Sequence, residues 1–241
     1  MVRYKIIFSS YQRIEKGVHV SKEIKGAILQ RDKETYAIVP RIPIGILTPE
    51  ILEKMAAIAR KYNIRIIKIT SGQRIALVGL RPEDVENAWK DLGMEVGPAE
   101  GLCVHYVQAC PGTETCKFGQ GDSIRLAAMI EKIYVGKEDL IPAKTKFGIS
   151  GCKLNCAESY LRDFGAFAAP DGWTIVVGGN SGGRPRIGNV VAEKLSEGQV
   201  LELIKKCIEY YGRNAKPRER MPRFIERIGI EAFKKAVLST G

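Results

Sequence analysis

The sequence of 241 residues lacks any apolar run long enough to span a membrane. Its first residues, MVRYK, do not open onto the apolar core of a secretory signal peptide. These two absences predict a cytoplasmic protein with no membrane partner. Six cysteines in a chain this long and rich in lysine do not make a disulfide framework. They favour metal ligation in a reducing compartment instead.

Motifs for binding nucleic acids and nucleotides are also missing. The net charge is +11, from 38 basic and 27 acidic residues, but no basic–aromatic stripe or nucleic-acid reader motif accompanies it. We therefore expect no nucleic-acid partner, and the positive surplus fits either a solvated surface or a site for an acidic small ligand. Without a G-x-G-x-x-G fingerprint or a flavin signature, the chain has no evident way to take electrons from a nicotinamide by itself.

The hydrophobic content of 45% supports a packed core, and the patterning predicts an α+β fold. Thr48 and Pro49 begin a helix, and Gly93 ends a second helix that begins near Pro82. These two helices are expected to cover one face of a largely antiparallel sheet. Its strands are predicted at residues 2–8, 25–31, 35–39, 64–70 and 74–79.

Gly97-Pro98 predicts a boundary between two domains, residues 1–98 and 99–241. In the second domain, Asp122 is a helix N-cap and Ser196 opens a capping box. The sequence predicts strands at 102–108, 145–150, 163–168 and 173–178, helices at 122–134 and 196–211, and short helices at the end of the chain.

Two cysteine pairs lie in this second half, Cys110 with Cys116 and Cys152 with Cys156. Four thiolates can hold an iron–sulfur cluster or a zinc ion, and the five-residue spacer of the first pair is longer than structural zinc sites use. One helical turn would place Cys152 and Cys156 on one side. The pattern therefore favours an iron–sulfur cluster, with zinc and plain buried thiols as alternatives. Cys103 and Cys207 have no partner spacing, and Cys207 fits a helical core position.

Basic and glycine-rich segments surround the cysteines. Lys144 and Lys146 alternate on a predicted strand, so both side chains would point to the same face. Residues 178–188 are rich in glycine and arginine, and such loops can present N–H groups and guanidinium groups to anions. Taken alone, a solvated strand face and an ordinary loop explain these two segments better.

The cysteine motifs, ACPGTETC at 109–116 and SGCKLNCAE at 150–158, make the chain resemble the siroheme-dependent sulfite and nitrite reductases. The resemblance covers nearly the whole chain, through VPRIP at 39–43, KITSGQRI at 68–75 and RFIERIG at 223–229. It looks most like the haem region of the assimilatory nitrite reductase large subunit. It implies a ferredoxin-like half-domain followed by a siroheme and iron–sulfur domain.

The resemblance also implies which residues bind the cofactors. Cys110, Cys116, Cys152 and Cys156 would hold a 4Fe-4S cluster, with Cys156 bridging to the siroheme iron. Siroheme carries eight carboxylates, so cations and backbone N–H groups are expected around its rim. The matching positions are Lys68, Thr70, Ser71, Asn180, Arg184 and Arg186.

By the same resemblance, Lys144 and Lys146 bind the oxyanion and donate protons to it. Some positions depart from the family pattern. Val39 and Gly72 stand where arginine is common, and Arg74 is a candidate replacement. Upstream of Cys110, where arginine is also common, the chain has His105 and Tyr106. His105 titrates near neutral pH and is a candidate proton donor, although a lone strand histidine is often structural.

The resemblance predicts six-electron reduction of sulfite to sulfide or of nitrite to ammonia. The alternative from another class is a siroheme and cluster protein that only transfers electrons. Larger family members carry this unit twice, so the single copy predicts a homodimer in which a second copy completes the haem pocket. A ferredoxin or a flavoprotein must supply the electrons, and the positive surface would attract an acidic donor.

Overall fold

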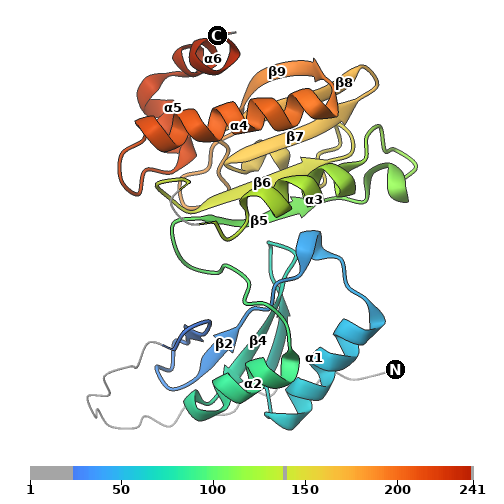
Figure 1. Cartoon of the computed structure of the whole chain (residues 1–241), viewed down its shortest axis with the longest axis vertical. Helices are drawn as coiled ribbons and strands as arrows, with labels where there is room; N and C mark the ends of the chain where they lie inside the picture. Colours follow the sequence, from blue (N-terminus) through green and yellow to red (C-terminus); the bar gives the residue numbers. More distant parts are fainter. Residues whose placement is uncertain (1–23, 138–139, 240–241) are drawn as a thin grey trace.

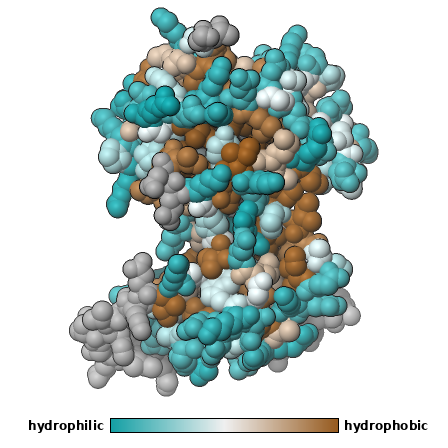
Figure 2. All heavy atoms as spheres, in the orientation of Figure 1, coloured by the Kyte–Doolittle hydropathy of each residue, from teal (hydrophilic) through white to brown (hydrophobic). Residues whose placement is uncertain are grey.

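The computed structural model describes residues 24–137 and 140–239, which form two lobes (Figure 1). The strand predicted at 2–8 lies outside the described residues. No helix in the described ranges is long and apolar enough to cross a membrane. Figure 2 shows a narrower region between the lobes, and apolar residues reach the surface there as well as on the upper lobe.

The first lobe is an antiparallel sheet with two helices, as predicted. The strand order is β1 (Ile28–Leu29), β2 (Tyr36–Ile38), β4 (Ile75–Leu80), β3 (Ile66–Ile69), and every pair is antiparallel. The Thr48 hydroxyl caps α1 (Pro49–Lys61) by accepting the Ile51 N–H. Gly93 ends α2 (Val85–Leu92) in the left-handed conformation, with φ of 60°. Ile38, Leu77 and Leu92 are fully buried in the core between the sheet and the helices.

The second lobe is a five-stranded mixed sheet in the order of the sequence. It contains β5 (Val104–Ala109), β6 (Thr145–Ser150), β7 (Phe164–Ala169), β8 (Gly172–Val177) and β9 (Asn189–Leu195). The first three strands are parallel, and the last three are antiparallel. The predicted hairpin around Pro170 is confirmed, since Ala169 pairs with Gly172. The sequence patterns did not indicate β9.

Helices cover one face of this sheet (Figure 1). Helix α3 (Ser123–Tyr134) packs on β5 and β6, and α4 (Glu197–Asn214) packs on β8 and β9. The predicted caps are present, because Asp122 accepts the Arg125 N–H and Ser196 forms a reciprocal capping box with Gln199. Two further helices, α5 (Met221–Ile228) and α6 (Ile230–Leu238), close the chain. Stacked Phe147 and Phe164 lie at the centre of the core.

The two lobes meet through a few polar contacts. Glu131 of α3 accepts the Ile44 N–H at 2.8 Å and pairs with Arg41 Nε at 3.4 Å. The Gln73 side chain exchanges two hydrogen bonds with the backbone of Ala109, at 2.8 and 3.1 Å. Ile44 belongs to the hydrophobic core of the second lobe although it comes from the first part of the chain. These contacts fix how the first lobe faces the end of β5.

Candidate metal and anion site

The two cysteine loops meet at one edge of the second sheet. Cys110 directly follows β5, and Gly151 and Cys152 directly follow the neighbouring parallel strand β6. The carboxyl ends of parallel strands share an edge, so the two loops begin side by side. The Gly151 N–H donates to Cys110 Sγ at 3.0 Å, and the Cys110 N–H donates to the Ile149 carbonyl at 3.2 Å.

Glycines allow the loops to pack at backbone distance. A Cβ atom on Gly151 would collide with the Cα atom of Gly112, which itself has φ of 56°. The segment after Cys116 folds back, and the Gly121 N–H donates to the Gly151 carbonyl at 3.1 Å. A larger residue at either glycine would separate the two cysteine loops.

The segment from Cys152 to Cys156 is a series of turns, so the predicted helical turn is wrong. Asn155 has φ of 61°, which a continuing helix does not allow, and its side chain accepts the Ser159 N–H at 2.7 Å. The hydroxyl oxygens of Ser159 and Ser150 also lie 2.9 Å apart. The chain after Cys156 therefore folds back across β6 and β7, on the face away from α3 and α4.

The cysteines of the two loops are free and accessible, as ligands of an iron–sulfur cluster must be. The four cysteines are free thiols with partly or fully exposed side chains, whereas Cys103 and Cys207 are buried. Within residues 24–137 and 140–239, no three Cys, His, Asp or Glu side chains lie close enough to bind one metal ion. A four-iron cluster is larger than a zinc ion, so its cysteines lie farther apart. The Gly151 N–H is the kind of donor that stabilises a thiolate sulfur.

Lys146 lies on β6, and Lys144 directly precedes this strand. Lys144 and Lys146 are half-buried. The alternate residues Thr145 and Phe147, which point to the other side of the strand from Lys146, are fully buried. Lys146 pairs in register with Tyr106 of β5, and its Nζ atom lies 5.8 Å from the centre of the Tyr106 ring. Burial lowers the pKa of both lysines, and the nearby guanidinium group of Arg220 lowers each further.

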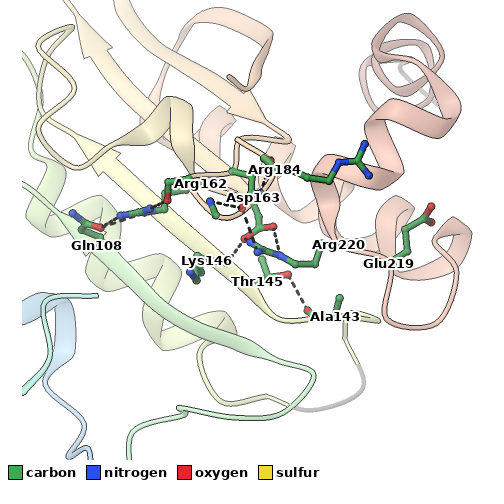
Figure 3. A network of polar contacts seen from close by, with 12 residues as sticks. Gln108, Ala143, Thr145, Lys146, Arg162, Asp163, Arg184, Glu219 and Arg220 are labelled. Atoms are coloured by element: carbon green, nitrogen blue, oxygen red, sulfur yellow. Dashed lines mark hydrogen bonds and ion pairs between the residues drawn. The ribbon is translucent and has the colours of Figure 1, made fainter. Parts of the chain in front are cut away.

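A buried carboxylate balances part of this positive charge (Figure 3). Asp163 is fully buried and accepts two hydrogen bonds from Arg220, of which the Nη2 contact is 2.6 Å. It also accepts the Lys146 backbone N–H at 2.9 Å. Burial raises the pKa of Asp163, and the Arg220 guanidinium opposes that rise.

Arg162 joins three segments of the site, and Figure 3 shows its side chain reaching Gln108. It is 3% exposed and donates to Gln108 Oε1 at 2.8 Å and to Ser181 Oγ at 3.0 Å. It also forms an ion pair with Glu158 at 2.6 Å. It thereby ties strand β5 to the loop that carries Cys156 and to the glycine-rich loop.

The glycine-rich loop is held by its own residues. Asn180 and Arg186 exchange backbone hydrogen bonds at 2.8 and 2.9 Å, and the Asn180 side chain donates to the Arg184 carbonyl. The Arg186 guanidinium donates to the Gly178 carbonyl and to Asn189 Oδ1, so it stabilises the loop. The Arg184 side chain is exposed and available to an anion.

Among the first-lobe candidates, Arg74 reaches the lysines. Its guanidinium donates to the Pro98 carbonyl at 2.5 Å, lies 5.4 Å from the centre of the Tyr106 ring, and contributes to lowering the Lys144 pKa. Thr70 supports the turn before Arg74 by accepting its N–H at 3.3 Å. Lys68 and Ser71 are exposed, and no interaction recorded within the described ranges links them to this group of cations.

His105 differs from its expected state. It is 1% exposed, and its Nε2 atom lies 3.0 Å from the Gly101 carbonyl. Burial lowers its pKa to about 4, and the charges of Lys144, Arg74 and Lys146 act in the same direction. The imidazole is therefore neutral at pH 7, and Nε2–H donates to Gly101 while Nδ1 is left as an acceptor. The expectation that His105 titrates near neutral pH does not hold in this position, and its role as a proton donor stays a prediction.

Comparisons with known proteins identify the family. The model of the nitrite and sulphite reductase 4Fe-4S domain matches residues 100–240, and the model of the nitrite/sulfite reductase ferredoxin-like half domain matches residues 28–95. The chain belongs to the nitrite and sulfite reductase family. The predicted order of a ferredoxin-like half-domain followed by an iron–sulfur domain is thus confirmed.

Family relatives differ in length. The chain is 57% identical over 219 residues to the assimilatory-type sulfite reductase of Nitratidesulfovibrio vulgaris, covering 91% of this chain and 100% of the relative. It is 37% identical over 204 residues to the NAD(P)H nitrite reductase of Bacillus subtilis, covering 85% of this chain but only 25% of that protein. Among solved structures, dissimilatory sulfite reductase I matches with a TM-score of 0.73 at 15% identity, over 86% of this chain and 70% of that chain. That last likeness concerns the fold alone.

Sequence reasoning missed Arg162, Asp163 and Arg220. The dipeptide Arg162-Asp163 immediately precedes β7, and a charged pair before an apolar strand usually indicates a solvated turn. Arg220 lies in a basic segment that patterning indicates only as a loop. Their meeting depends on the chain crossing the open face of the sheet, and no local pattern in the sequence reports this.

Proposed function

We propose that this member of the family reduces sulfite to sulfide by six electrons, at a siroheme coupled to a 4Fe-4S cluster. The observation that carries the proposal is the 57% identity to an assimilatory-type sulfite reductase over that protein's whole length. Nitrite is the second candidate substrate, because the chain is also 33–38% identical to several nitrite reductases over 85–88% of its length.

Four cysteines would hold the cluster, and Cys156, which is the exposed one, would be shared with the siroheme iron. When bound, the coupled pair would deliver electrons one at a time to an anion on the iron. Arg184 and Asn180 support binding of the siroheme carboxylates from the glycine-rich loop. Lys68, Thr70, Ser71 and Arg186 complete the proposed carboxylate-binding set.

Lys144 and Lys146 would bind the oxyanion and supply protons as its bonds to oxygen break. Burial among other cations lowers the pKa of both ammonium groups, which makes them stronger acids than exposed lysines. Arg74 would place a third positive charge at the anion. His105, as a neutral imidazole, would accept a hydrogen bond or relay a proton.

The deciding experiment is anaerobic oxidation of a reduced viologen by purified, fully loaded protein, with sulfite and with nitrite. Turnover with sulfite is expected. Isobacteriochlorin absorption without turnover on either anion would favour a protein that only transfers electrons. Lys144→Ala should slow turnover strongly while leaving the absorption spectrum nearly intact. If that variant instead loses its haem, Lys144 binds the cofactor.

We also propose a division into two domains, a dimeric assembly and a class of electron donor. The chain divides into units at 1–98 and 99–241, acts as a cytoplasmic homodimer, and receives electrons from a ferredoxin-like protein or a flavoprotein. The single copy of the repeated unit and the net charge of +11 support a second subunit and an acidic donor. Light scattering of the loaded protein tests the dimer, and an active haem-loaded monomer would contradict it.

A further inference from the structure

Three buried polar atoms beside Lys146 have no hydrogen-bond partner within the part of the chain that the structure describes. They are Arg74 Nε, His105 Nδ1 and the Tyr106 hydroxyl. His105 is 1% exposed and Tyr106 is 7% exposed, so bulk water does not satisfy them. Buried polar atoms nearly always have a partner, and leaving one unpaired lowers stability. Arg74, His105 and Tyr106 line one small cavity, so the three unpaired atoms indicate a single place that a polar group could complete.

Tyr106 lies close to two of the cations. Its ring has the Arg74 guanidinium 5.4 Å away and Lys146 Nζ 5.8 Å away, measured to the ring centre. Its Cα atom pairs with that of Lys146 across β5 and β6. Burial raises the pKa of the phenol, although Arg162 and Arg74 act against this. The hydroxyl therefore keeps its proton at neutral pH and is a hydrogen-bond donor.

Gly72 makes room for the Tyr106 ring. A Cβ atom on residue 72 would lie 2.8 Å from two atoms of that ring, which is closer than Cβ atoms approach carbon. The backbone of the first lobe thus comes close to the ring, and any side chain at 72 would push the ring away from its place near Arg74 and Lys146. The position of Tyr106 depends on glycine at 72.

We propose that the Tyr106 hydroxyl donates a hydrogen bond to an oxygen of the oxyanion substrate, next to the ammonium groups of Lys144 and Lys146. This inference rests on the proposed function. Tyr106 lies just upstream of Cys110, where arginine is common in the family, and would bind the substrate there through a neutral hydroxyl. Because it adds a directional donor without adding charge, it would orient the sulfite oxygen that accepts its hydrogen bond.

The test is Tyr106→Phe in fully loaded protein, with sulfite affinity measured anaerobically from the change in haem absorption. Loss of a hydrogen bond to a charged group should weaken sulfite binding about ten- to one-hundredfold. The thermal midpoint of the cofactor-free variant should stay unchanged or rise, since the hydroxyl has no partner there. A merely structural tyrosine would lower that midpoint and leave affinity unchanged.

Tyr62→Phe is the matched control, because its hydroxyl pairs with Asp91 on the exposed surface of the first lobe. It should bind sulfite like the unmodified protein. Gly72→Ala, which displaces the ring, should weaken sulfite binding in the same direction as Tyr106→Phe. Unchanged affinity in Tyr106→Phe overturns the inference, as does loss of siroheme with unchanged affinity per haem. If the unmodified loaded protein binds neither sulfite nor nitrite, the proposed function itself fails.

Discussion

At the scale of single residues, the candidate site carries more positive than negative charge. After burial itself, Arg74 and Arg220 lower the pKa of Lys144, Arg220 and Lys144 lower that of Lys146, and Asp163 is the fully buried acid among them. Cations held this close repel each other, and part of that repulsion remains until an anion binds. The arrangement is therefore prepared for anionic oxygen, and its integrity depends on Asp163.

Replacing Asp163 tests this dependence. Asp163→Asn removes the charge that Arg220 and the Lys146 N–H contact. We expect a loss of about 3 kcal/mol in the free energy of unfolding, at the low end for a broken buried pair because Arg220 is 31% exposed. Asp171→Asn, which breaks only the exposed pair with Lys194, should cost less than about 0.5 kcal/mol. Equal losses in urea unfolding would contradict the role of Asp163.

The neutral state of His105 gives a pH dependence. Its folded pKa is about 4, below the ordinary value of 6.5, so between these values the unfolded chain takes up a proton that the folded chain does not. Stability should fall as the pH decreases from 6.5 towards 4, by about 3 kcal/mol from this residue. His105→Gln should lose less stability over that range when both proteins are unfolded in urea at pH 7 and pH 4.5. Parallel losses would show that His105 is not the cause.

At the scale of helices, strands and loops, local signals predicted what depends on local chemistry. The caps at Thr48, Asp122 and Ser196 start helices as expected, because a side-chain oxygen and a backbone N–H three residues away suffice. The turns from Cys152 to Cys156 were missed because the deciding contacts come from Ser150 and from the next strand. Spacing alone indicated that the cysteines act together, but not how their loop folds.

Glycine in β7 permits this fold-back. A Cβ atom on Gly165 would overlap the carbonyl of Ser159, in the segment that follows Cys156. Gly165→Ala should therefore destabilise the protein by about 2–3 kcal/mol and lower the iron bound per chain. Gly198→Ala is the control, since nothing lies within 4 Å of its Cβ position in α4, and it should stabilise by about 0.5 kcal/mol. Full iron content in Gly165→Ala would show that the loop has another support.

At the scale of the whole molecule, the proposed anion site draws on both lobes. Arg74 and Gly72 come from the first, and Lys144, Lys146 and Tyr106 from the second. Sequence patterns predicted most elements of each lobe but not β9, and they carried no information on how the lobes face each other. That arrangement depends on single hydrogen bonds between distant residues, such as Gln73 with Ala109.

Glu131 offers the sharpest test of the contact between lobes. Its carboxylate accepts the N–H of Ile44, a residue held at φ of 46°. Glu131→Ala would leave that buried N–H unpaired, at a cost of about 1–3 kcal/mol, and would let the first lobe shift relative to the second. Sulfite affinity should fall because Arg74 would no longer be held beside Tyr106. Glu131→Gln keeps an acceptor and should lose less.

Glu95→Ala separates this effect from a simple loss of charge. Glu95 pairs with the same Arg41 at 2.7 Å, but its side chain is 73% exposed and stays within the first lobe. This variant should keep both its stability and its sulfite affinity within error of the unmodified protein. If Glu131→Ala behaves the same way, the lobes are held by apolar packing around Ile44 alone, and the placement of Arg74 over Tyr106 does not depend on the carboxylate.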